Sequence, residues 1–329
     1  MARSIPVDDP SRVAEIRRAT LAVAQEEGLD EKLGGNAAIV STEVSTNLLK
    51  YARQGEVFIS PFAPGTGPGV EILAVDRGPG IKDLAASLVD GYSSAQSSGT
   101  GLGAISRLSQ EFDIYTEVDK GTVLVSRIGG STHALISVGS VIKPLAGEDI
   151  SGDAWGFSER DGAIALVVAD GLGHGVEASR ASSEAVAAFR RATDLSPISV
   201  LRQIHDALHS TRGAAVAVAN IDPSNRTIQY AGIGNIGGVI AQTGRSEFMV
   251  SHSGTAGYQM PRVQEFSYSI PEGALIIMHS DGLTTNWNLD VYPGLRRSHP
   301  SVIAGVLYRD ATRHRDDVCV VVAKIRSNS

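Results

Sequence analysis

The order in which helical and strand-like patterns follow one another is the feature that most restricts the fold of this chain. The first half opens with apolar residues at helical spacing over 10–27 and 36–51, then turns to short strand-like runs with one helical stretch among them. The second half begins with strand-like runs, continues with helical patterns over 176–193 and 198–211, and closes with more strand-like runs. Two blocks of different order predict an α+β chain, whose second block is a β-sandwich with helices packed outside.

A chain of 329 residues also suits two domains of ordinary size better than a single core. Gly129, Gly130 and Ser131 stand between the last strand-like run of the first block and the first one of the second. We therefore place the boundary there, and expect one domain over residues 1–129 and another over residues 130–329.

Composition and charge exclude several classes of partner. The net charge is −7, with acidic residues in excess in both halves, so neither half has the basic field that nucleic acid or an anionic membrane requires. The single cysteine, Cys319, lies in an apolar run and allows no disulfide within the chain, which suits a reducing compartment. The N-terminus lacks the apolar core of a signal peptide, and no stretch approaches the ~20 apolar residues of a membrane span. We expect a cytoplasmic protein.

Polar residues and glycines of the first block come in an order typical of a nucleotide site. Glu43 and Asn47 stand four residues apart in a helical pattern and share a face. The stretch VDRGPGI follows with Asp76, and SGTGLGA then opens a helix. Five glycines accompany these residues: Gly78, Gly80, Gly99, Gly101 and Gly103. A Glu–Asn pair alone is more often a solvated polar face, but the ordered set predicts phosphate binding at a helix N-terminus.

This ordered set resembles the GHKL (Bergerat) ATP-binding fold, an α/β sandwich, over about residues 10–128. Within that fold it is most similar to the small bacterial serine kinases of the anti-sigma-factor type, the RsbT and RsbW group. The resemblance implies that Asn47 coordinates Mg²⁺ on the ATP phosphates and that Glu43 is the general base for a protein serine or threonine. It also implies that Asp76 accepts a hydrogen bond from the adenine amino group.

The glycines have separate roles under the same resemblance. Gly78 and Gly80 would let the backbone pass close to the base, and the later glycines, with Leu102 between two of them, would present N–H groups to the phosphates. Thr122 in KGTVLV matches a family threonine near the nucleotide, although a threonine that simply favours a strand explains it equally well.

Aspartates in the second block occur where strand-like runs stop. They are Asp153, Asp170, Asp281, Asp316 and Asp317. One acid in such a place is usually a turn residue, but two of these follow apolar runs and precede a glycine, in VVADG and IIMHSDG. Close carboxylates repel one another or become protonated unless divalent cations hold them. Oxygen-only ligands favour Mg²⁺ or Mn²⁺ over zinc.

The pattern resembles the PPM-type metal-dependent Ser/Thr phosphatases, in the SpoIIE-type branch and nearest its RsbX-like members, over about residues 133–326. It implies an αββα sandwich with two Mn²⁺ or Mg²⁺ ions. Asp170 would bridge the ions, and Asp153 and the carbonyl of Gly171 would hold one of them. Asp281 and Asp316 would bind the other ion, although the adjacent Asp317 leaves this register open.

Other polar residues near these motifs remain ambiguous. His174 could protonate the leaving serine oxygen or have a structural role. The loop SHSGTAGYQ departs from the usual Pro-Ile/Leu-Gly loop of the family, and no arginine is an obvious phosphate ligand, although Arg313 and Arg315 are candidates. The stretch HDALH, with His205 and His209, imitates a zinc motif, but no third ligand follows and we expect no zinc there.

Two opposed motif sets on one chain imply a bifunctional partner-switching regulator of bacterial stress or sigma-factor signalling. It would phosphorylate and dephosphorylate a STAS-domain partner, with ATP and Mg²⁺ in the first domain and the two metal ions in the second. One alternative keeps only the phosphatase as an enzyme and makes the first domain a nucleotide-gated binding module that sequesters or activates a partner, such as a downstream phosphatase. Another is a conventional anti-sigma factor that binds a sigma factor directly. The oligomeric state stays open.

Overall fold

The computed structural model describes residues 3–62, 67–88, 101–130, 135–160, 162–260 and 262–326. The chain divides into two compact units, each described by itself. Unit 1 comprises Met1–Ala134 and Arg297–Arg309, and unit 2 comprises Leu135–Arg296 and Asp310–Ser329. Unit 1 therefore takes up a segment that the sequence boundary assigned to the second domain.

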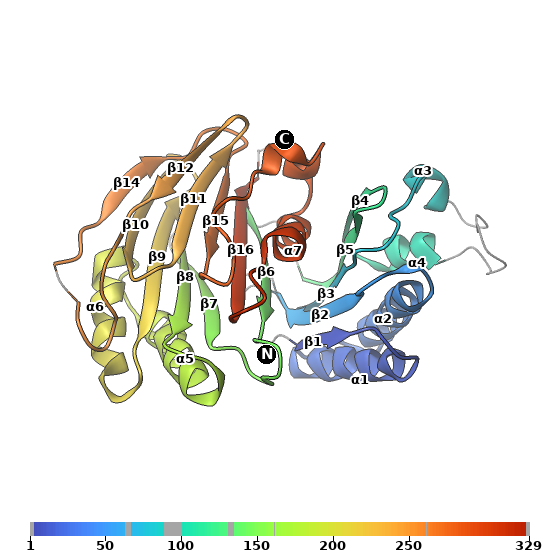
Figure 1. The fold of residues 1–329 in the computed structure, drawn as a ribbon, viewed down its shortest axis with the longest axis horizontal. Coiled ribbons are helices and arrows are strands. Elements are labelled where there is room, and N and C mark those ends of the chain that lie inside the picture. Colours follow the sequence, from blue (N-terminus) through green and yellow to red (C-terminus); the bar gives the residue numbers. More distant parts are fainter. Residues whose placement is uncertain are drawn as a thin grey trace. The chain divides into compact units, whose positions relative to one another are not determined.

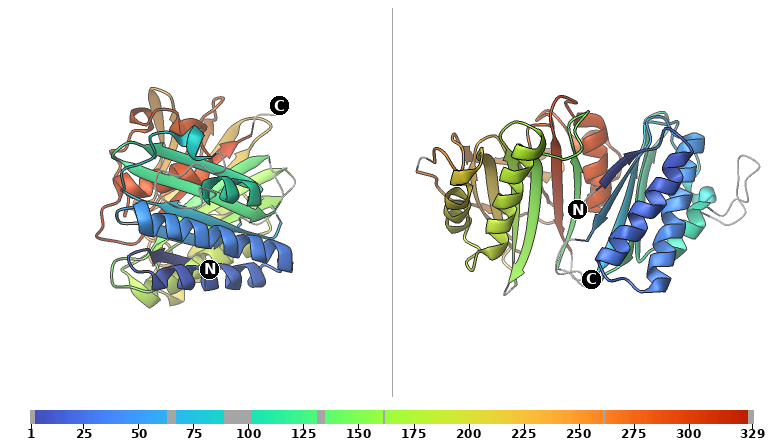
Figure 2. Two further views of the ribbon diagram at one scale, coloured as in Figure 1. Left: turned by 90° about the vertical axis from the view of Figure 1, so that its right-hand side faces the viewer. Right: turned by 90° about the horizontal axis from the view of Figure 1, so that it is seen from below.

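Unit 1 is built on an antiparallel sheet with the strand order β1-β2-β3-β5-β4. Helices α1 and α2 and the shorter α4 cover one face of this sheet (Figures 1 and 2). Helix α2 begins at Glu31 rather than at Asn36, because the side chain of Asp30 caps it by accepting from the N–H of Leu33. The bounds are β1 (Arg3–Pro6), α1 (Ser11–Glu26), α2 (Glu31–Tyr51), β2 (Glu56–Pro61), β3 (Gly69–Val75), α3 (Leu84–Ser87), α4 (Gly101–Leu108), β4 (Glu111–Glu117) and β5 (Gly121–Gly129).

The other face of this sheet receives residues of α7 (Pro300–Ala311), which follows far later in the chain. The rings of Tyr308 and Phe58 meet edge to face with centroids 5.2 Å apart. A Cβ placed on Gly305 would lie 2.7 Å from a methyl group of Val123, so α7 approaches β5 closely at this point. This packing explains why every residue of β3 is buried, a pattern typical of a strand covered on both faces.

A buried polar cluster joins α7 to the same sheet. Glu71 Oε2 accepts from Nε of Arg127 at 2.6 Å and from Oγ of Ser301 at 2.7 Å. Ser301 and Arg127 are 174 residues apart in the chain. Because a buried ion pair is tolerated only when its hydrogen bonds are satisfied, this cluster ties the position of α7 to that of β3 and β5.

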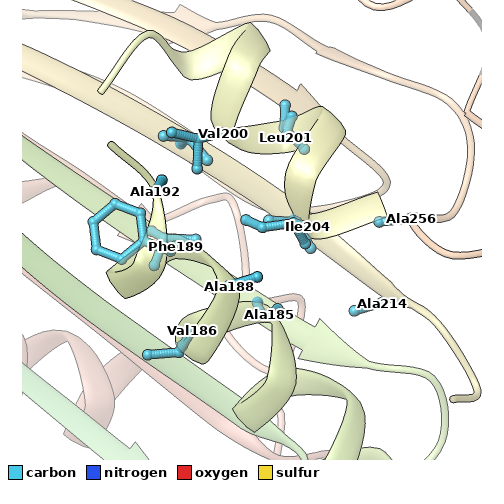
Figure 3. Close-up of a cluster of buried hydrophobic side chains, with 14 of the residues drawn as sticks. Ala185, Val186, Ala188, Phe189, Ala192, Val200, Leu201, Ile204, Ala214 and Ala256 are labelled. Atoms are coloured by element: carbon cyan, nitrogen blue, oxygen red, sulfur yellow. The ribbon is translucent and has the colours of Figure 1, made fainter. Parts of the chain in front are cut away.

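Unit 2 contains two sheets, with strand orders β13-β10-β9-β8-β7, where β14 also pairs with β10, and β12-β11-β15-β16-β6. Helices α5 and α6 pack on the first sheet over a core of small and branched side chains (Figure 3). The bounds are β6 (Ile136–Lys143), β7 (Asp153–Arg160), β8 (Ala163–Gly171), α5 (Gly175–Arg191), α6 (Pro197–Ala207), η1 (Leu208–Ser210), β9 (Ala214–Asp222), β10 (Thr227–Ile233), β11 (Gly237–Gln242), β12 (Arg245–Met249), β13 (Ser251–His252), β14 (Phe266–Ser269), β15 (Leu275–His279), η2 (Leu289–Val291), η3 (Leu295–Arg297) and β16 (Val318–Ile325).

The α+β class is confirmed. The order of elements was incomplete, because strand β1 precedes the helices of the first block and helix α7 interrupts the strands that close the second. Helix α6 stops at Ala207 and continues as a short 3-10 turn, so the expected helix over 198–211 was drawn slightly too long. Helices α5 and α6 form one helical layer of the expected αββα sandwich, whereas most of α7 belongs to unit 1. In the described part of the chain, no helix combines the length and apolar character that crossing a membrane requires.

Candidate functional site

The aspartates of unit 2 gather at one edge of its sheets. β7 and β8 pair antiparallel, with Asp153 directly opposite Asp170. Asp281 follows β15, and Asp316 and Asp317 precede β16, the antiparallel neighbour of β15. The expectation that strands stop at these acids is therefore wrong for Asp153, Asp316 and Asp317. The acids still meet, because the start of one antiparallel strand and the end of its neighbour share an edge.

These carboxylates raise one another's pKa. Burial, followed by the charges of Asp281, Asp316 and Asp317, raises the pKa of Asp170 to about 7. Burial and then the charge of Asp170 raise the pKa of Asp153 well above its ordinary value. Burial also raises the pKa of Asp281 and of Asp317, and the charge of Asp316 adds to both effects. Such a cluster is costly when ionised unless cations neutralise it.

Neutral polar side chains hold two of the carboxylates. Ser280 Oγ donates to Asp153 Oδ2 at 2.6 Å and accepts from the N–H of Cys319 at 2.9 Å. Asn235 Nδ2 donates to Asp281 Oδ2 at 2.6 Å. Neither residue is among the site residues predicted from the sequence. Only their places in the sequence could have suggested them, since Ser280 precedes Asp281 and Asn235 lies in the glycine-rich turn YAGIGNIGG.

The two adjacent aspartates have different environments. Asp317 is buried, and its Oδ1 accepts from the N–H of Leu145 at 2.9 Å. Within the described residues, Oδ2 of Asp317 is buried without a hydrogen-bond partner. Asp316 is exposed, and its Oδ1 accepts from the N–H of Asp317 at 2.9 Å. Asp317 is thus fixed by the backbone, whereas Asp316 faces solvent beside the other acids.

The turn after β8 brings a histidine to the same edge. A Cβ on Gly171 would collide with the carbonyl oxygen of Ala178, so only glycine allows helix α5 to start this close to the strand. Nδ1 of His174 lies 2.6 Å from Oε1 of Glu148, a partner that the sequence analysis missed. His174 is exposed and close enough to Asp317 for its charge to lower that pKa.

The donor set fits hard divalent cations. Its side chains offer only oxygen, which Mg²⁺ and Mn²⁺ prefer, and the buried Oδ2 of Asp317 lacks a partner within the described residues. Over those residues no three His, Cys, Asp or Glu side chains form a complete ligand cluster. Divalent cations there would take carboxylate oxygens from this set and complete their coordination with water, as Mg²⁺ favours.

In unit 1, the N-terminus of α4 meets two polar side chains of α2. A Cβ placed on Gly101 would lie 3.4 Å from Oε2 of Glu43 and 3.4 Å from Nδ2 of Asn47. Both side chains are half-buried. The structure thus brings together the predicted base, the predicted Mg²⁺ ligand and the first residue of a helix whose N-terminus favours phosphate.

Asp76 lies at the end of β3 and is fixed by backbone contacts. Its Oδ1 accepts from the N–H of Gly78 at 2.6 Å, and its own N–H donates to the carbonyl oxygen of Thr122 at 2.9 Å. Burial raises its pKa, an effect that hydrogen bonds from the backbone oppose. Gly121, with φ of +97°, leaves no room for a Cβ, which would collide with the carbonyl oxygen of Asp76.

The remaining predicted nucleotide residues have mixed placements. Gly80 has φ of +68°, and a Cβ there would collide with the carbonyl oxygen of Glu117. Gly103 is buried and Leu102 half-buried in α4, whereas Gly99 lies outside the described residues. The hydroxyl of Thr122 lies 3.0 Å from that of Thr116, a contact between neighbouring strands.

The histidine pair of HDALH binds backbone. Nδ1 of His205 accepts from the N–H of Gly257 at 2.9 Å, and Nδ1 of His209 lies 2.9 Å from the carbonyl oxygen of the same residue. The two imidazole rings hold a loop in place, and the described residues offer no metal cluster around them.

Comparison with known proteins assigns a family to each half. The family described as Stage II sporulation protein E (SpoIIE) matches residues 160–326, and the family described as histidine kinase-like ATPase domain matches residues 7–128. Serine/threonine-protein kinase RsbT of Bacillus subtilis is 32% identical over 100 residues, which are 30% of this chain and 75% of that protein. Phosphoserine phosphatase RsbX of the same organism is 23% identical over 181 residues, 54% of this chain and 89% of that protein.

Two solved structures extend these matches. A chain from the bacterial stressosome, described as a modular system adapted to control secondary messenger signaling, is 30% identical with a TM-score of 0.52, and covers 57% of this chain and 99% of its own. The PP2C phosphatase domain of SpoIIE from Bacillus subtilis, solved with a fragment of its regulatory domain, is 18% identical with a TM-score of 0.50. It covers 97% of this chain and 94% of its own, which shows a shared fold.

Proposed function

Since this chain belongs to the SpoIIE family and joins to it a histidine kinase-like ATPase domain, we propose that it is a regulator with two opposed activities. Unit 2 removes phosphate from a serine or threonine of a protein partner, and unit 1 uses ATP to place it there. The observation that carries the proposal is the cluster of carboxylates in unit 2, whose pKa values are raised by burial and by one another.

The phosphatase site assigns a role to each carboxylate. Asp170, Asp153 and the carbonyl of Gly171 would hold one cation, and Asp170, Asp281 and Asp316 would hold the other. Asp316 is the better ligand of the adjacent pair for the second position, because it is exposed beside Asp281, whereas Asp317 spends one oxygen on the N–H of Leu145. Divalent cations held there supply charge neutralisation and an activated water nucleophile at neutral pH.

His174 would donate a proton to the leaving serine oxygen. Glu148 accepts or shares the proton of Nδ1, which fixes the ring and leaves Nε2 for the leaving serine oxygen. Ser280 and Asn235 act one step further from the substrate, because each orients a carboxylate by a hydrogen bond of 2.6 Å.

The kinase site uses fewer charged groups. Asn47 would hold Mg²⁺ on the phosphates, Glu43 would accept the proton of the attacking hydroxyl, and Asp76 would bind the adenine amino group. The contact of Glu43 and Asn47 with Gly101 supports this proposal, as does the identity with RsbT. Simultaneous activity in both units would only hydrolyse ATP, so a signal or a partner must favour one of them.

The proposed partner is a STAS-domain phosphoprotein, and the proposal is tested in two reactions. In the first, full-length protein with Mn²⁺ is given the serine-phosphorylated partner, and phosphate release is measured for wild type and for Asp170→Ala. Unchanged release from the variant would contradict the metal assignment. In the second, wild type is given ATP, Mg²⁺ and the unphosphorylated partner. A parallel sample contains Asp170→Ala instead, because this variant should not remove the phosphate again. No transfer in either sample would remove the kinase half.

The alternative function, a nucleotide-gated binding module, rests on the same residues of unit 1 and requires no phosphate transfer. Glu43→Gln distinguishes the two functions, because a base is required for transfer and dispensable for nucleotide binding. Loss of transfer with retained ATP affinity supports the kinase. A wild type that binds ATP and captures the partner only with nucleotide, yet transfers nothing, supports the binding module.

A further inference from the structure

An exposed arginine lies beside the turn that carries Asp170. Arg212 lies two residues before the start of β9, and a Cβ placed on Gly173 would lie 3.2 Å from its Nη1. Gly173 is three residues beyond Asp170, so the guanidinium lies against the same turn. Within the part of the chain that the structure describes, Arg212 has no ion-pair or hydrogen-bond partner. A cation is therefore available next to an anionic cluster.

Three large apolar side chains are exposed around the same turn. Leu172, in the turn itself, is 45% exposed, and Val176, in the first turn of α5, is 68% exposed. Tyr258 in SHSGTAGYQ is 69% exposed. Exposed apolar residues that occur singly need no explanation, but three beside one polar site indicate a binding surface.

Gly213 is the point at which the turn and the Tyr258 loop, residues 254–259, come together. Its carbonyl oxygen accepts from the N–H of Leu172 at 3.0 Å. A Cβ on Gly213, where φ is +76°, would lie 2.6 Å from the carbonyl oxygen of Ala256 and 3.0 Å from Cδ2 of Tyr258. Leu172 and Tyr258 therefore both lie close to Gly213, the residue that follows Arg212.

The Tyr258 loop is held rigidly rather than simply exposed. Thr255 and Gln259 exchange backbone hydrogen bonds of 2.9 and 3.0 Å, and Ala256 exchanges two with Ala214. Figure 3 labels Ala256 and Ala214 at the margin of the core beneath α6. His205 and His209 bind the N–H and carbonyl of Gly257 from the other side. The two histidines of the zinc-like motif thus fix the backbone next to Tyr258.

We propose that Arg212 binds the phosphate group of the substrate, and that Leu172, Val176 and Tyr258 bind apolar side chains next to the phosphorylated serine or threonine. This inference rests on the proposed phosphatase activity. A guanidinium can hold two phosphate oxygens at once, and its charge offsets the repulsion between the phosphate dianion and the carboxylates.

Phosphate recognition is tested with full-length protein in Mn²⁺, using p-nitrophenyl phosphate and a phosphoserine peptide. Arg212→Ala should raise KM for both substrates and the inhibition constant of inorganic phosphate by about 10- to 100-fold, the range for a charged hydrogen bond, with much less change in kcat. Arg212→Lys should recover part of this loss. Arg191→Ala is the matched control, because Arg191 is exposed and pairs with Glu184 at 2.7 Å. An inhibition constant that moves with Arg313→Ala and not with Arg212→Ala overturns the assignment.

The apolar surface is tested with two phosphoserine peptides that differ only in flanking residues, leucine or glycine. Wild type should prefer the leucine peptide, and Leu172→Ser with Tyr258→Ser should abolish the preference, with a larger rise in KM for the leucine peptide than for p-nitrophenyl phosphate. Phe248→Ser is the control, since Phe248 is 61% exposed on β12. A preference that survives the double variant contradicts the proposed surface.

Peptide binding separates failure of this inference from failure of the proposed function. Anisotropy of a labelled leucine peptide in Mn²⁺ reports binding without turnover. If wild type binds the peptide more tightly than Arg212→Ala does but releases no phosphate, the phosphatase activity is refuted and the docking site stands. If wild type releases phosphate but the variants at Arg212, Leu172 and Tyr258 bind the peptide as tightly as wild type does, the phosphatase activity stands and the docking site is refuted.

Discussion

The two candidate sites of this chain are constructed in different ways. In unit 2, carboxyl groups dominate, because burial and the charges of neighbouring carboxylates raise the pKa of Asp153, Asp170 and Asp281, so that ionisation is costly without cations. In unit 1, backbone shape dominates, because Gly78 and Gly121 stand where a Cβ would press on Asp76. A site of the first kind is sensitive to charge and pH, and a site of the second kind is sensitive to added volume.

The repeated Gly-Leu-Gly illustrates the same difference. In α4, Gly101 faces Glu43 and Asn47, and a larger side chain there would press on these two polar groups. In the turn after β8, Gly171 is needed because α5 crosses at the carbonyl of Ala178. The first glycine lets the start of α4 come close to two polar side chains of α2, whereas the second one lets a strand and a helix meet beside a carboxylate.

The largest expected effect is the loss of charge at the centre of the carboxylate site. Asp170→Ala should lower kcat of phosphate release by at least about 1000-fold, because both cation positions depend on this residue. ATP affinity should not change. The measurement is release of phosphate from a phosphoserine peptide in Mn²⁺, with Asp206→Ala, an exposed acid on α6, as control. Loss of ATP binding in Asp170→Ala would contradict the separation of the two sites.

Stability of the metal-free protein should fall as pH rises. A carboxyl group whose pKa is raised by folding stabilises the folded state below its unfolded pKa, and this stability is lost as pH rises through the folded value. For Asp170 this window runs from its ordinary value of 3.8 to about 7, and Asp153 shifts in the same direction. The loss should be on the order of a few kcal/mol.

Thermal unfolding in a chelator between pH 5 and pH 8 measures this effect. Tm should fall across the range for wild type and much less for Asp170→Asn, which removes the central charge. At pH 8, where Tm of wild type is lowest, excess Mn²⁺ should raise it towards its value at pH 5. Equal slopes of Tm against pH for both proteins would show that the carboxylates do not control stability.

Added volume should damage the other site. Gly121→Ala forces a Cβ onto the carbonyl of Asp76 and also strains a φ of +97°, so unit 1 should lose about 1–3 kcal/mol of stability. ATP affinity should fall by about tenfold or more, because the hydrogen bonds of Asp76 shift. Isothermal titration with ATP and Mg²⁺ measures the affinity. Gly28→Ala is the control, since Gly28 has φ of +71° and open space around it.

The sequence predicts best what depends on local pattern. The α+β class follows from the alternation of periods, and the strands before Asp170 and Asp281 follow from apolar runs that end in acids. The placement of Asp153 opposite Asp170 depends on strand register, which neither run specifies alone. Local pattern therefore identifies which residues are unusual, and pairing decides which of them meet.

Long-range partners are the part that the sequence does not predict. Nothing in the periodicity of α7 indicates that Ser301 will donate to Glu71, because the contact spans 230 residues and joins segments assigned to different domains. Asn235 is similar, since a polar residue in a glycine-rich turn is ordinary until Asp281 lies 2.6 Å away. The roles of Ser301 and Asn235 each depend on one contact with a residue far away in the sequence. No pattern in the neighbouring sequence indicates that contact.

The smallest expected effect tests whether the carboxylate site also depends on neutral neighbours. Asn235→Ala removes the hydrogen bond that orients Asp281, so the Mn²⁺ concentration for half-maximal phosphatase activity should rise by about tenfold, the lower range for such supporting residues. The maximal rate should change little, because every proposed cation ligand is retained. Asn225→Ala is the matched control, since Asn225 donates to Asp222 in an exposed turn. An unchanged Mn²⁺ requirement in Asn235→Ala would mean that strand geometry alone positions Asp281, and that charge and backbone suffice to build this site.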